Sequence, residues 1–175
     1  MATRSIRVTL LRHGLAVDRE DWAKKNDLAR PLTEKGERRV RQASRGLAAL
    51  GVKPDLVLTS PAIRAVQTAK AAAEVLKIPP NQVHEEVSLA PDASPEDFLA
   101  TIEALEVKEV LAVGHAPHLD EVLAGLLGLR HGRGGLSLKK SGAALVRVAR
   151  GRPGAAEVRA LCSPWALRRI GKKAR

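Results

Sequence analysis

Short apolar runs separated by polar segments predict the strands of a sheet. Ile6, Val8 and Leu10 alternate with polar residues and predict a strand that ends near Arg12. Two compact apolar runs predict buried strands, and two later runs predict a pair of strands joined by a turn at 151–154. These four runs cover residues 55–59, 107–113, 143–148 and 157–161.

Between the predicted strands, apolar residues recur every three or four positions, which is the spacing of amphipathic helices. Four helices are expected, beginning after Thr33, at Ser60, at Ser94 and near Leu119. Ser60 is the expected cap of the second helix, with Pro61 at its first position. The first helix is expected to bury Val40, Ala43, Leu47 and Leu50, and the second Ile63, Val66, Ala69, Ala73 and Leu76.

The remaining segments are polar or rich in glycine and are expected to be irregular. Residues 14–32, 84–94 and 130–142 are predicted loops, and the basic tail from Ala166 is expected to fray. The alternation of strands and helices predicts an α/β fold, because parallel strands joined by helices form a sheet covered on both faces. We therefore expect one domain over residues 1–175, a three-layer sandwich with a mostly parallel central sheet.

Two arginines and two histidines are expected to meet at one edge of this sheet. Arg12 and His13 follow the first strand, Arg64 lies in the first turn of the helix after the second strand, and His115 follows the third strand. Ligands of such folds bind beyond the carboxyl ends of the strands. Arginine can bond two phosphate oxygens, and a neutral imidazole can attack phosphorus. The four residues therefore predict a phosphoryl-transfer site that requires no metal or other cofactor.

The charge and composition narrow the class of partner. The chain has 30 basic and 19 acidic residues, and this net charge of +11 favours anionic partners. Nucleic acid is not the expected one, because the sequence lacks the interleaved aromatic and basic residues that stack single-stranded bases. No apolar run approaches the ~20 residues of a membrane span. Cys162 is the only cysteine, and a cytoplasmic location is expected.

Four segments resemble the signatures of the histidine phosphatase superfamily, also called the phosphoglycerate mutase-like family. They cover residues 11–14, 31–36, 59–69 and 113–115. The short chain is most similar to the bacterial SixA-type phosphohistidine phosphatases, which segments 89–91 and 162–164 also resemble. The resemblance extends over nearly the whole chain and implies a phosphoglycerate mutase-like fold.

The resemblance also implies a role for each residue of the predicted site. His13 would be the nucleophile, Arg12 and Arg64 would bind the phosphoryl oxygens, and His115 would stabilise the transferring group. Many members carry a carboxylic acid that protonates an alcohol leaving group. Glu86 and Asp92 lie near the comparable place, although neither matches clearly. SixA-type enzymes lack an evident acid, and the imidazole that leaves from a phosphorus–nitrogen bond needs less help from one.

The leading interpretation is a phosphohistidine phosphatase that acts on a phosphorylated protein, such as a histidine phosphotransfer domain. The short loops 14–32 and 84–94 favour it, because an uncovered site could admit a side chain of a folded protein. One alternative is a phosphatase or mutase that acts on small phosphate esters. Another is a non-catalytic phosphate-binding module on the same fold, which the intact His13, Arg12 and Arg64 disfavour.

Overall fold

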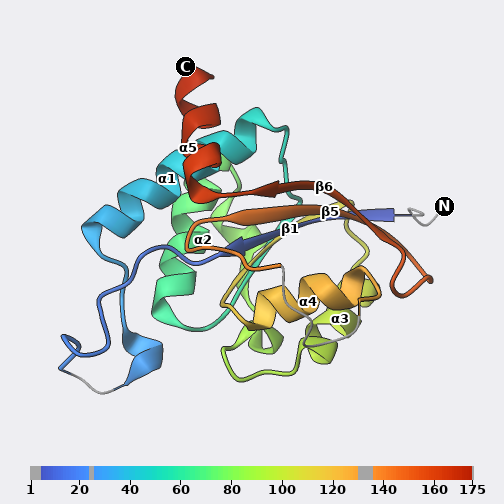
Figure 1. The fold of residues 1–175 in the computed structure, drawn as a ribbon, viewed down its shortest axis with the longest axis horizontal. Coiled ribbons are helices and arrows are strands. Elements are labelled where there is room, and N and C mark those ends of the chain that lie inside the picture. The colour runs from blue at the N-terminus through green and yellow to red at the C-terminus, as the bar shows by residue number, and fades with distance from the viewer. Residues whose placement is uncertain (1–4, 24–25, 130–135, 175) are drawn as a thin grey trace.

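The sheet has six strands in the order β3-β2-β4-β1-β5-β6. This computed structural model describes residues 5–23, 26–129 and 136–174 (Figure 1). The first four strands run parallel, and the last two form an antiparallel hairpin beside β1, so the expected mostly parallel sheet is confirmed. The strands are β1 (Ser5–Arg12), β2 (Leu56–Thr59), β3 (Val83–Glu85), β4 (Glu109–Gly114), β5 (Ala143–Ala149) and β6 (Ala156–Cys162).

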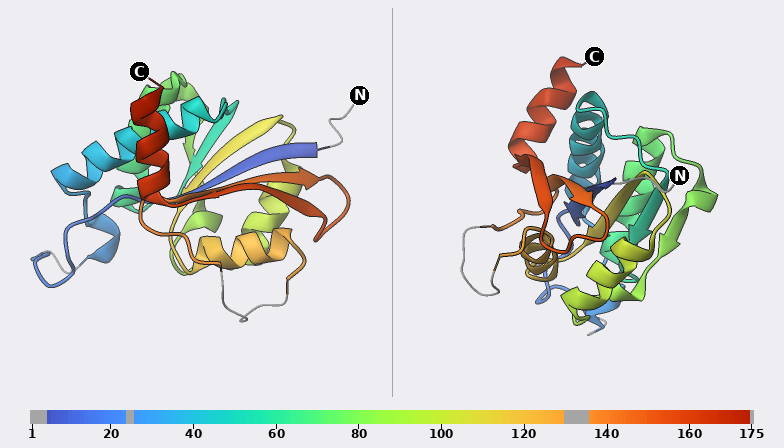
Figure 2. Two further views of the ribbon diagram at one scale, coloured as in Figure 1. Left: turned by 45° about the horizontal axis from the view of Figure 1, so that its top comes forward. Right: turned by 90° about the vertical axis from the view of Figure 1, so that its right-hand side faces the viewer.

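Helices cover both faces of the sheet and complete the predicted three layers (Figures 1 and 2). The α-helices are α1 (Glu34–Ala49), α2 (Ile63–Leu76), α3 (Pro95–Ala104), α4 (His118–Leu126) and α5 (Pro164–Lys173). Short 3-10 helices are η1 (Asp27–Ala29), η2 (Pro80–Gln82) and η3 (Val87–Leu89). Within the described ranges, no helix combines the length and apolar character that crossing a membrane requires.

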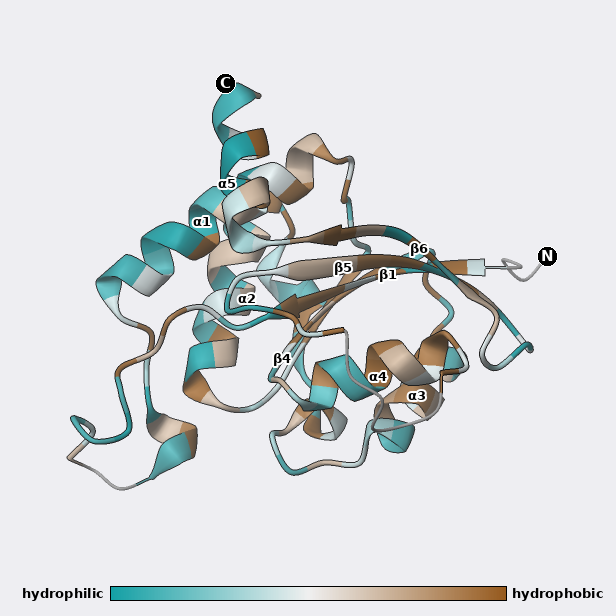
Figure 3. Cartoon of the chain, in the orientation of Figure 1, coloured by the Kyte–Doolittle hydropathy of each residue, from teal (hydrophilic) through white to brown (hydrophobic). Residues whose placement is uncertain are grey.

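Two apolar clusters, one on each face of the sheet, hold the layers together. Phe98 of α3 and Leu123 of α4 pack on one face, and Leu47 of α1 and Ala69 of α2 pack on the other. Figure 3 shows the matching pattern, with apolar colour on the central strands and hydrophilic colour on the outer sides of α1 and α5.

The second helix begins later than the sequence predicts. α2 starts at Ile63, its cap is Ala62, and no side chain caps it, so the prediction that Ser60 caps this helix is wrong. Ala65 is fully buried against the sheet, whereas Ile63, predicted on the buried face, is 41% exposed. Leu50, predicted on the buried face of the first helix, lies at its end and is 40% exposed.

Three segments predicted to be irregular contain regular structure. η1 lies within the predicted loop 14–32, and β3 enters the predicted loop 84–94 as a short edge strand. The tail does not fray but forms α5, which packs against α1 with Leu167 fully buried. A Cβ atom at Gly46 would collide with the carbonyl of Leu167, so this glycine lets the two helices approach closely. Of the predicted loop 130–142, residues 130–135 lie outside the described residues.

Candidate active site

Backbone hydrogen bonds bring the ends of three strands together. β4 lies between β2 and β1, so the segments that follow these strands are neighbours. The amide of His13 donates to the carbonyl of Gly114 at 2.9 Å, and the amide of Ser60 donates to that of Val113, also at 2.9 Å. As a result, the rings of His13 and His115 face each other with their centroids 5.0 Å apart.

The hydrogen bond of His13 fixes the position of its ring proton. Nδ1 lies 2.7 Å from the carbonyl oxygen of Gly14, and because a carbonyl can only accept, the proton sits on Nδ1. Nε2 then carries the lone pair, and it makes no hydrogen bond in the part of the chain that the structure describes. Burial is the main cause that lowers the pKa of His13 to about 4. The Gly14 bond opposes it, and Arg64, Arg12 and Lys140 contribute to the lowering. His13 is therefore neutral near pH 7, with a free ring nitrogen.

His115 is held by the residue predicted to cap the second helix. Its Nε2 lies 2.8 Å from the hydroxyl oxygen of Ser60, and only 4% of the residue is exposed. Burial lowers the pKa of His115 to about 3, with smaller contributions from His13 and Arg64. Both rings are thus neutral and recessed, so a substrate has to reach into the site with a side chain or a small group.

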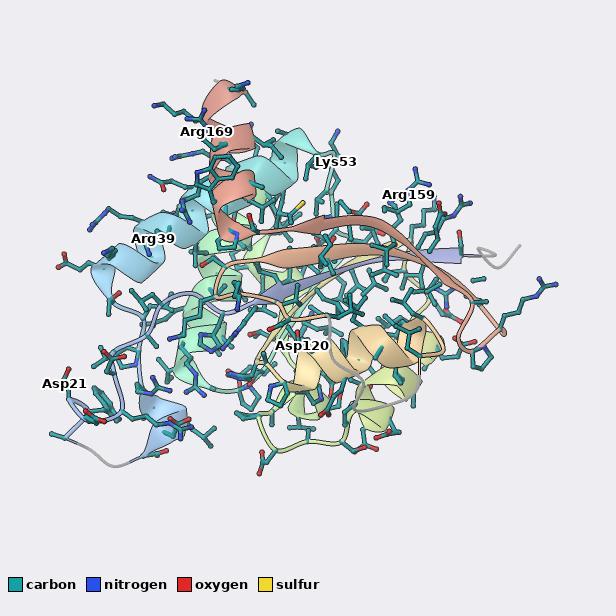
Figure 4. All side chains as sticks on the ribbon, in the orientation of Figure 1. Asp21, Arg39, Lys53, Asp120, Arg159 and Arg169 are labelled. Atoms are coloured by element: carbon teal, nitrogen blue, oxygen red, sulfur yellow. The ribbon has the colours of Figure 1, made fainter. Side chains whose placement is uncertain are left out.

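Arg12 is positioned through the loop that precedes β5. Its NH1 donates to the carbonyl of Leu138 at 2.8 Å, and the amide of Leu138 donates to Oδ1 of Asp120 at 2.8 Å. Asp120, labelled in Figure 4, lies in the first turn of α4. Burial raises the pKa of Asp120, although the Leu138 bond and Arg12 oppose the rise. The Nε of Arg12 is buried and has no acceptor among the described residues.

Arg64 forms a two-point contact with Asp27 of η1. Its NH1 donates to the Asp27 carbonyl at 2.6 Å, and its NH2 donates to Oδ2 at 2.9 Å. Arg30 and Arg19 contact Oδ1 of the same carboxylate. Burial raises the pKa of Asp27, but Arg64 and Arg30 outweigh it and hold the pKa below its usual value. The carboxylate is therefore ionised near neutral pH and fixes the loop over Arg64.

Thr68 connects the segment of His13 and Gly14 to α2. Its hydroxyl donates to the carbonyl of Arg64 at 2.7 Å and accepts from the amide of Gly14 at 3.1 Å. The two contacts fix His13 relative to the first turn of the helix. In the same turn, the Nε of Arg64 is buried without an acceptor in the described residues. Two buried arginine N–H groups that lack partners are places where an oxyanion would supply the missing acceptor.

The two carboxylates considered as general acids do not join this set. Oε1 of Glu86 accepts from the amide and the hydroxyl of Ser88 at 3.0 and 2.9 Å and so caps η3. Asp92 is exposed, and no hydrogen bond in the described residues links either carboxylate to His13 or His115. Across the described ranges, no group of three His, Cys, Asp or Glu side chains could hold a metal ion.

Four residues that support the site were not singled out in the sequence, or were given another role. Thr68 could have been found, because it lies four residues after Arg64 on the same helical face. Ser60 was correctly placed at the strand end but assigned to a cap. Asp27 and Asp120 give no local pattern, because their partners lie far along the chain in Arg64 and Leu138.

Comparison with known proteins gives the family. The model of the histidine phosphatase superfamily (branch 1) matches residues 8–87. An uncharacterized protein of Picosynechococcus sp. is 39% identical over 140 residues, which cover 69% of this chain and 82% of that protein. The chain belongs to the histidine phosphatase superfamily. Its signature segments are those that bring Arg12, His13 and Arg64 to the carboxyl edge of the sheet.

Solved structures place this superfamily member close to SixA. The protein histidine phosphatase SixA complexed with tungstate shares 28% identity and a TM-score of 0.81, over 93% of this chain and 99% of that one. A SixA structure from Agrobacterium tumefaciens shares 26% identity and a TM-score of 0.72, over 91% and 98% of the two chains. A phosphoglycerate mutase from Bacillus anthracis, 13% identical with a TM-score of 0.70, shares the fold, which confirms the predicted phosphoglycerate mutase-like architecture. The chain is a phosphatase of this fold.

Proposed function

We propose that this phosphatase removes phosphoryl groups from phosphohistidine in proteins, with Nε2 of His13 as the nucleophile. The observation that carries the proposal is the neutral His13 ring, whose proton is fixed on Nδ1 by Gly14 and whose Nε2 is free. A neutral imidazole with an available lone pair is the form that attacks phosphorus. The likeness to SixA, a protein histidine phosphatase, supports the substrate class.

The reaction proceeds in two transfers. In the first, Nε2 of His13 forms a bond to phosphorus while the phosphorus–nitrogen bond of the substrate breaks, and the substrate imidazole leaves with the electron pair. In the second, water attacks the phosphorus of phospho-His13 and releases inorganic phosphate and the free histidine. Both arginines and His115 surround the group and stabilise the charge on its oxygens. The SixA complex with tungstate, a tetrahedral oxyanion, supports a site of this kind.

The choice between phosphohistidine and phosphate esters depends on the leaving group. An alkoxide usually needs a proton from a positioned acid, whereas an imidazole needs less help. Among the carboxylates discussed above, Asp27 is ionised by its arginine partners and Glu86 is engaged by Ser88. We infer that esters react slowly at this site. His115 is not proposed as the acid for the leaving group, because its low pKa keeps it neutral near pH 7.

Quench-flow with labelled phosphohistidine protein tests the proposal, together with phosphoserine peptide and sugar phosphate as competing substrates. An alkali-stable, acid-labile label is expected on the wild-type enzyme and is expected to be absent from His13→Ala. His84→Ala is the matched control, because His84 is an exposed histidine of the edge strand β3. It should be labelled like the wild type.

Two results separate the alternatives. A labelled His13 with faster turnover of sugar phosphates would keep the nucleophile and select the small-ester phosphatase. No label and no turnover on any of the three substrates, with His13 intact, would select a non-catalytic phosphate-binding module.

A further inference from the structure

Two adjoining clefts run from the active site across α1 and α5. The first, about 420 Å³, reaches from Arg12 to the start of α5 and includes Arg39, Lys139, Lys140, Trp165 and Arg168. The second, about 400 Å³, shares Trp165 and Arg168 and continues along Arg45, Arg169 and Lys172. Because they share two residues, the clefts form one continuous surface, called here the basic cleft.

The basic cleft carries a strong and unpaired positive charge. Eight basic side chains and no carboxylate line it among the described residues. None of these eight forms an ion pair within the part of the chain that the structure describes. By contrast, Arg41 on α1 is paired with both Glu37 and Glu74. The excess of basic residues in the sequence is thus concentrated, in part, on a surface that leads to the nucleophile.

The inner end of the cleft is part of the electrostatic environment of the active site. Arg12 lines the cleft and lowers the pKa of His13, and so does Lys140. A polypeptide whose phosphorylated side chain reaches His13 can therefore lay its neighbouring residues over Lys139 and Lys140. From there, the surface extends to Trp165 without a break.

The outer part of the cleft is held rigidly and presents an aromatic anchor. Leu167 is fully buried, and a Cβ at Gly171 would lie 2.7 Å from the amide nitrogen of Gly46, so α5 is fixed against α1. Trp165 in the first turn of α5 is nevertheless 64% exposed, with the guanidinium of Arg169 5.7 Å from its ring. Exposed tryptophan and arginine are the residues that most often dominate the binding energy of protein interfaces.

We propose that the basic cleft docks an acidic face of the phosphoprotein substrate, next to its phosphohistidine. This inference rests on the proposed function, which supplies the phosphohistidine. The charge calls for a polyanion, and the single exposed tryptophan is not a series of stacking platforms for bases. An acidic polypeptide satisfies both the charge and the continuity with the active site. Arg39 and Arg169 lie at the cleft end of the molecule, and Arg159 on β6 lies at the opposite end (Figure 4).

Two phosphohistidine peptides provide the probe, one with glutamates beside the phosphohistidine and one with glutamines at the same positions. Free phosphoimidazole reports on the chemistry alone. The test variant is Arg169→Ala/Lys172→Ala, which removes two exposed charges of the cleft. The matched control is Lys108→Ala/Arg147→Ala. It removes two exposed charges near the start of β1, at the end of this strand that is opposite to the active site.

The wild type is expected to show a higher kcat/KM for the glutamate peptide than for the glutamine peptide, and salt should reduce this preference. In the test variant, the ratio of kcat/KM for the glutamate peptide to that for the glutamine peptide should be about threefold to tenfold lower than in the wild type, as expected for the loss of a few exposed ion pairs. The control should keep it, and all three proteins should hydrolyse phosphoimidazole equally. An equal preference in the test and control variants, or none in the wild type, would overturn the docking proposal.

Binding of the unphosphorylated peptides, measured by fluorescence anisotropy, separates this proposal from the proposed function. If no phosphohistidine substrate is hydrolysed, the proposed function fails. Docking would still be supported if the wild type binds the glutamate peptide more tightly than the glutamine peptide and the test variant does not. A single-stranded oligonucleotide serves as the competing polyanion. If it binds more tightly than the glutamate peptide, and the test variant weakens it, the cleft is a nucleic-acid surface and the proposal is wrong.

Discussion

Replacing Arg64 with lysine should remove most of the activity although the positive charge is kept. Arg64 makes two hydrogen bonds in a fixed geometry, to the carbonyl and the carboxylate of Asp27, and its side chain is 4% exposed. An ammonium group cannot reproduce both contacts and also present a planar edge to a phosphoryl group. Losing one donor to the transition state lowers the rate by about 10²- to 10³-fold.

The expected loss of stability is smaller and can be measured separately. A hydrogen bond to a charged group contributes about 1.5–3 kcal/mol, and we take the lower part of that range because Asp27 is one-third exposed. Denaturant unfolding of Arg64→Lys should therefore show a loss of about 1.5–2 kcal/mol. A change of that size leaves a typical domain folded at 25 °C, so unfolding cannot account for the lost turnover.

Arg7→Lys is the matched control for this prediction. Arg7 also makes two contacts to one carboxylate, because its Nε and NH2 lie 2.8 and 2.7 Å from Oε2 of Glu109. This pair lies near the start of β1, away from the active site at the end of that strand. Arg7→Lys should lose stability without losing kcat. Steady-state kinetics with phosphoimidazole and phosphohistidine protein provide the assay. If Arg64→Lys turns over within a few-fold of the wild type, Arg64 only holds the loop of Asp27, and the reasoning about phosphoryl binding is refuted.

Three further outcomes are expected. After correction for uncatalysed hydrolysis, kcat/KM should stay level on acidification and fall about tenfold per pH unit only below a midpoint near 4, where His13 protonates; a midpoint near 6.5 would contradict this. The free energy of unfolding should decrease as the pH falls from about 6.5 toward 4, because only the unfolded chain protonates His13 and His115 there; pH-independent urea midpoints would contradict it. Asp120→Asn should keep the hydrogen bond from the Leu138 amide and nearly full activity. Asp120→Ala should lower kcat/KM about fivefold, because Arg12 is then held less firmly through Leu138. Equal kinetics of the two variants would exclude this role for Asp120.

Chelator provides a last check on the chemistry. Activity should persist in excess chelator, because Arg12 and Arg64 supply the positive charge of the proposed mechanism. Loss of activity that a divalent ion restores would show that the mechanism is incomplete.

The sequence by itself determined the layered fold and the meeting of its two arginines and two histidines. Each of these residues stands directly after an apolar run or in the helical turn that follows one. The carboxyl ends of parallel strands necessarily share an edge, so the strand-end positions alone placed Arg12, His13 and His115 at one edge of the sheet. The one-turn helical geometry after β2 then brought Arg64 to the same place.

The tertiary structure decided how these residues are held and which surface leads to them. Ser60 contacts His115 instead of capping α2, because the helix starts after Ala62, two residues later than predicted. Asp27 and Asp120 act across long separations in the chain, which no local pattern encodes. The basic tail became a rigid wall of the cleft because glycines at 46 and 171 let two helices touch. Hydrophobic periodicity specifies which face of an element is buried, whereas contacts between distant polar groups depend on the assembled fold.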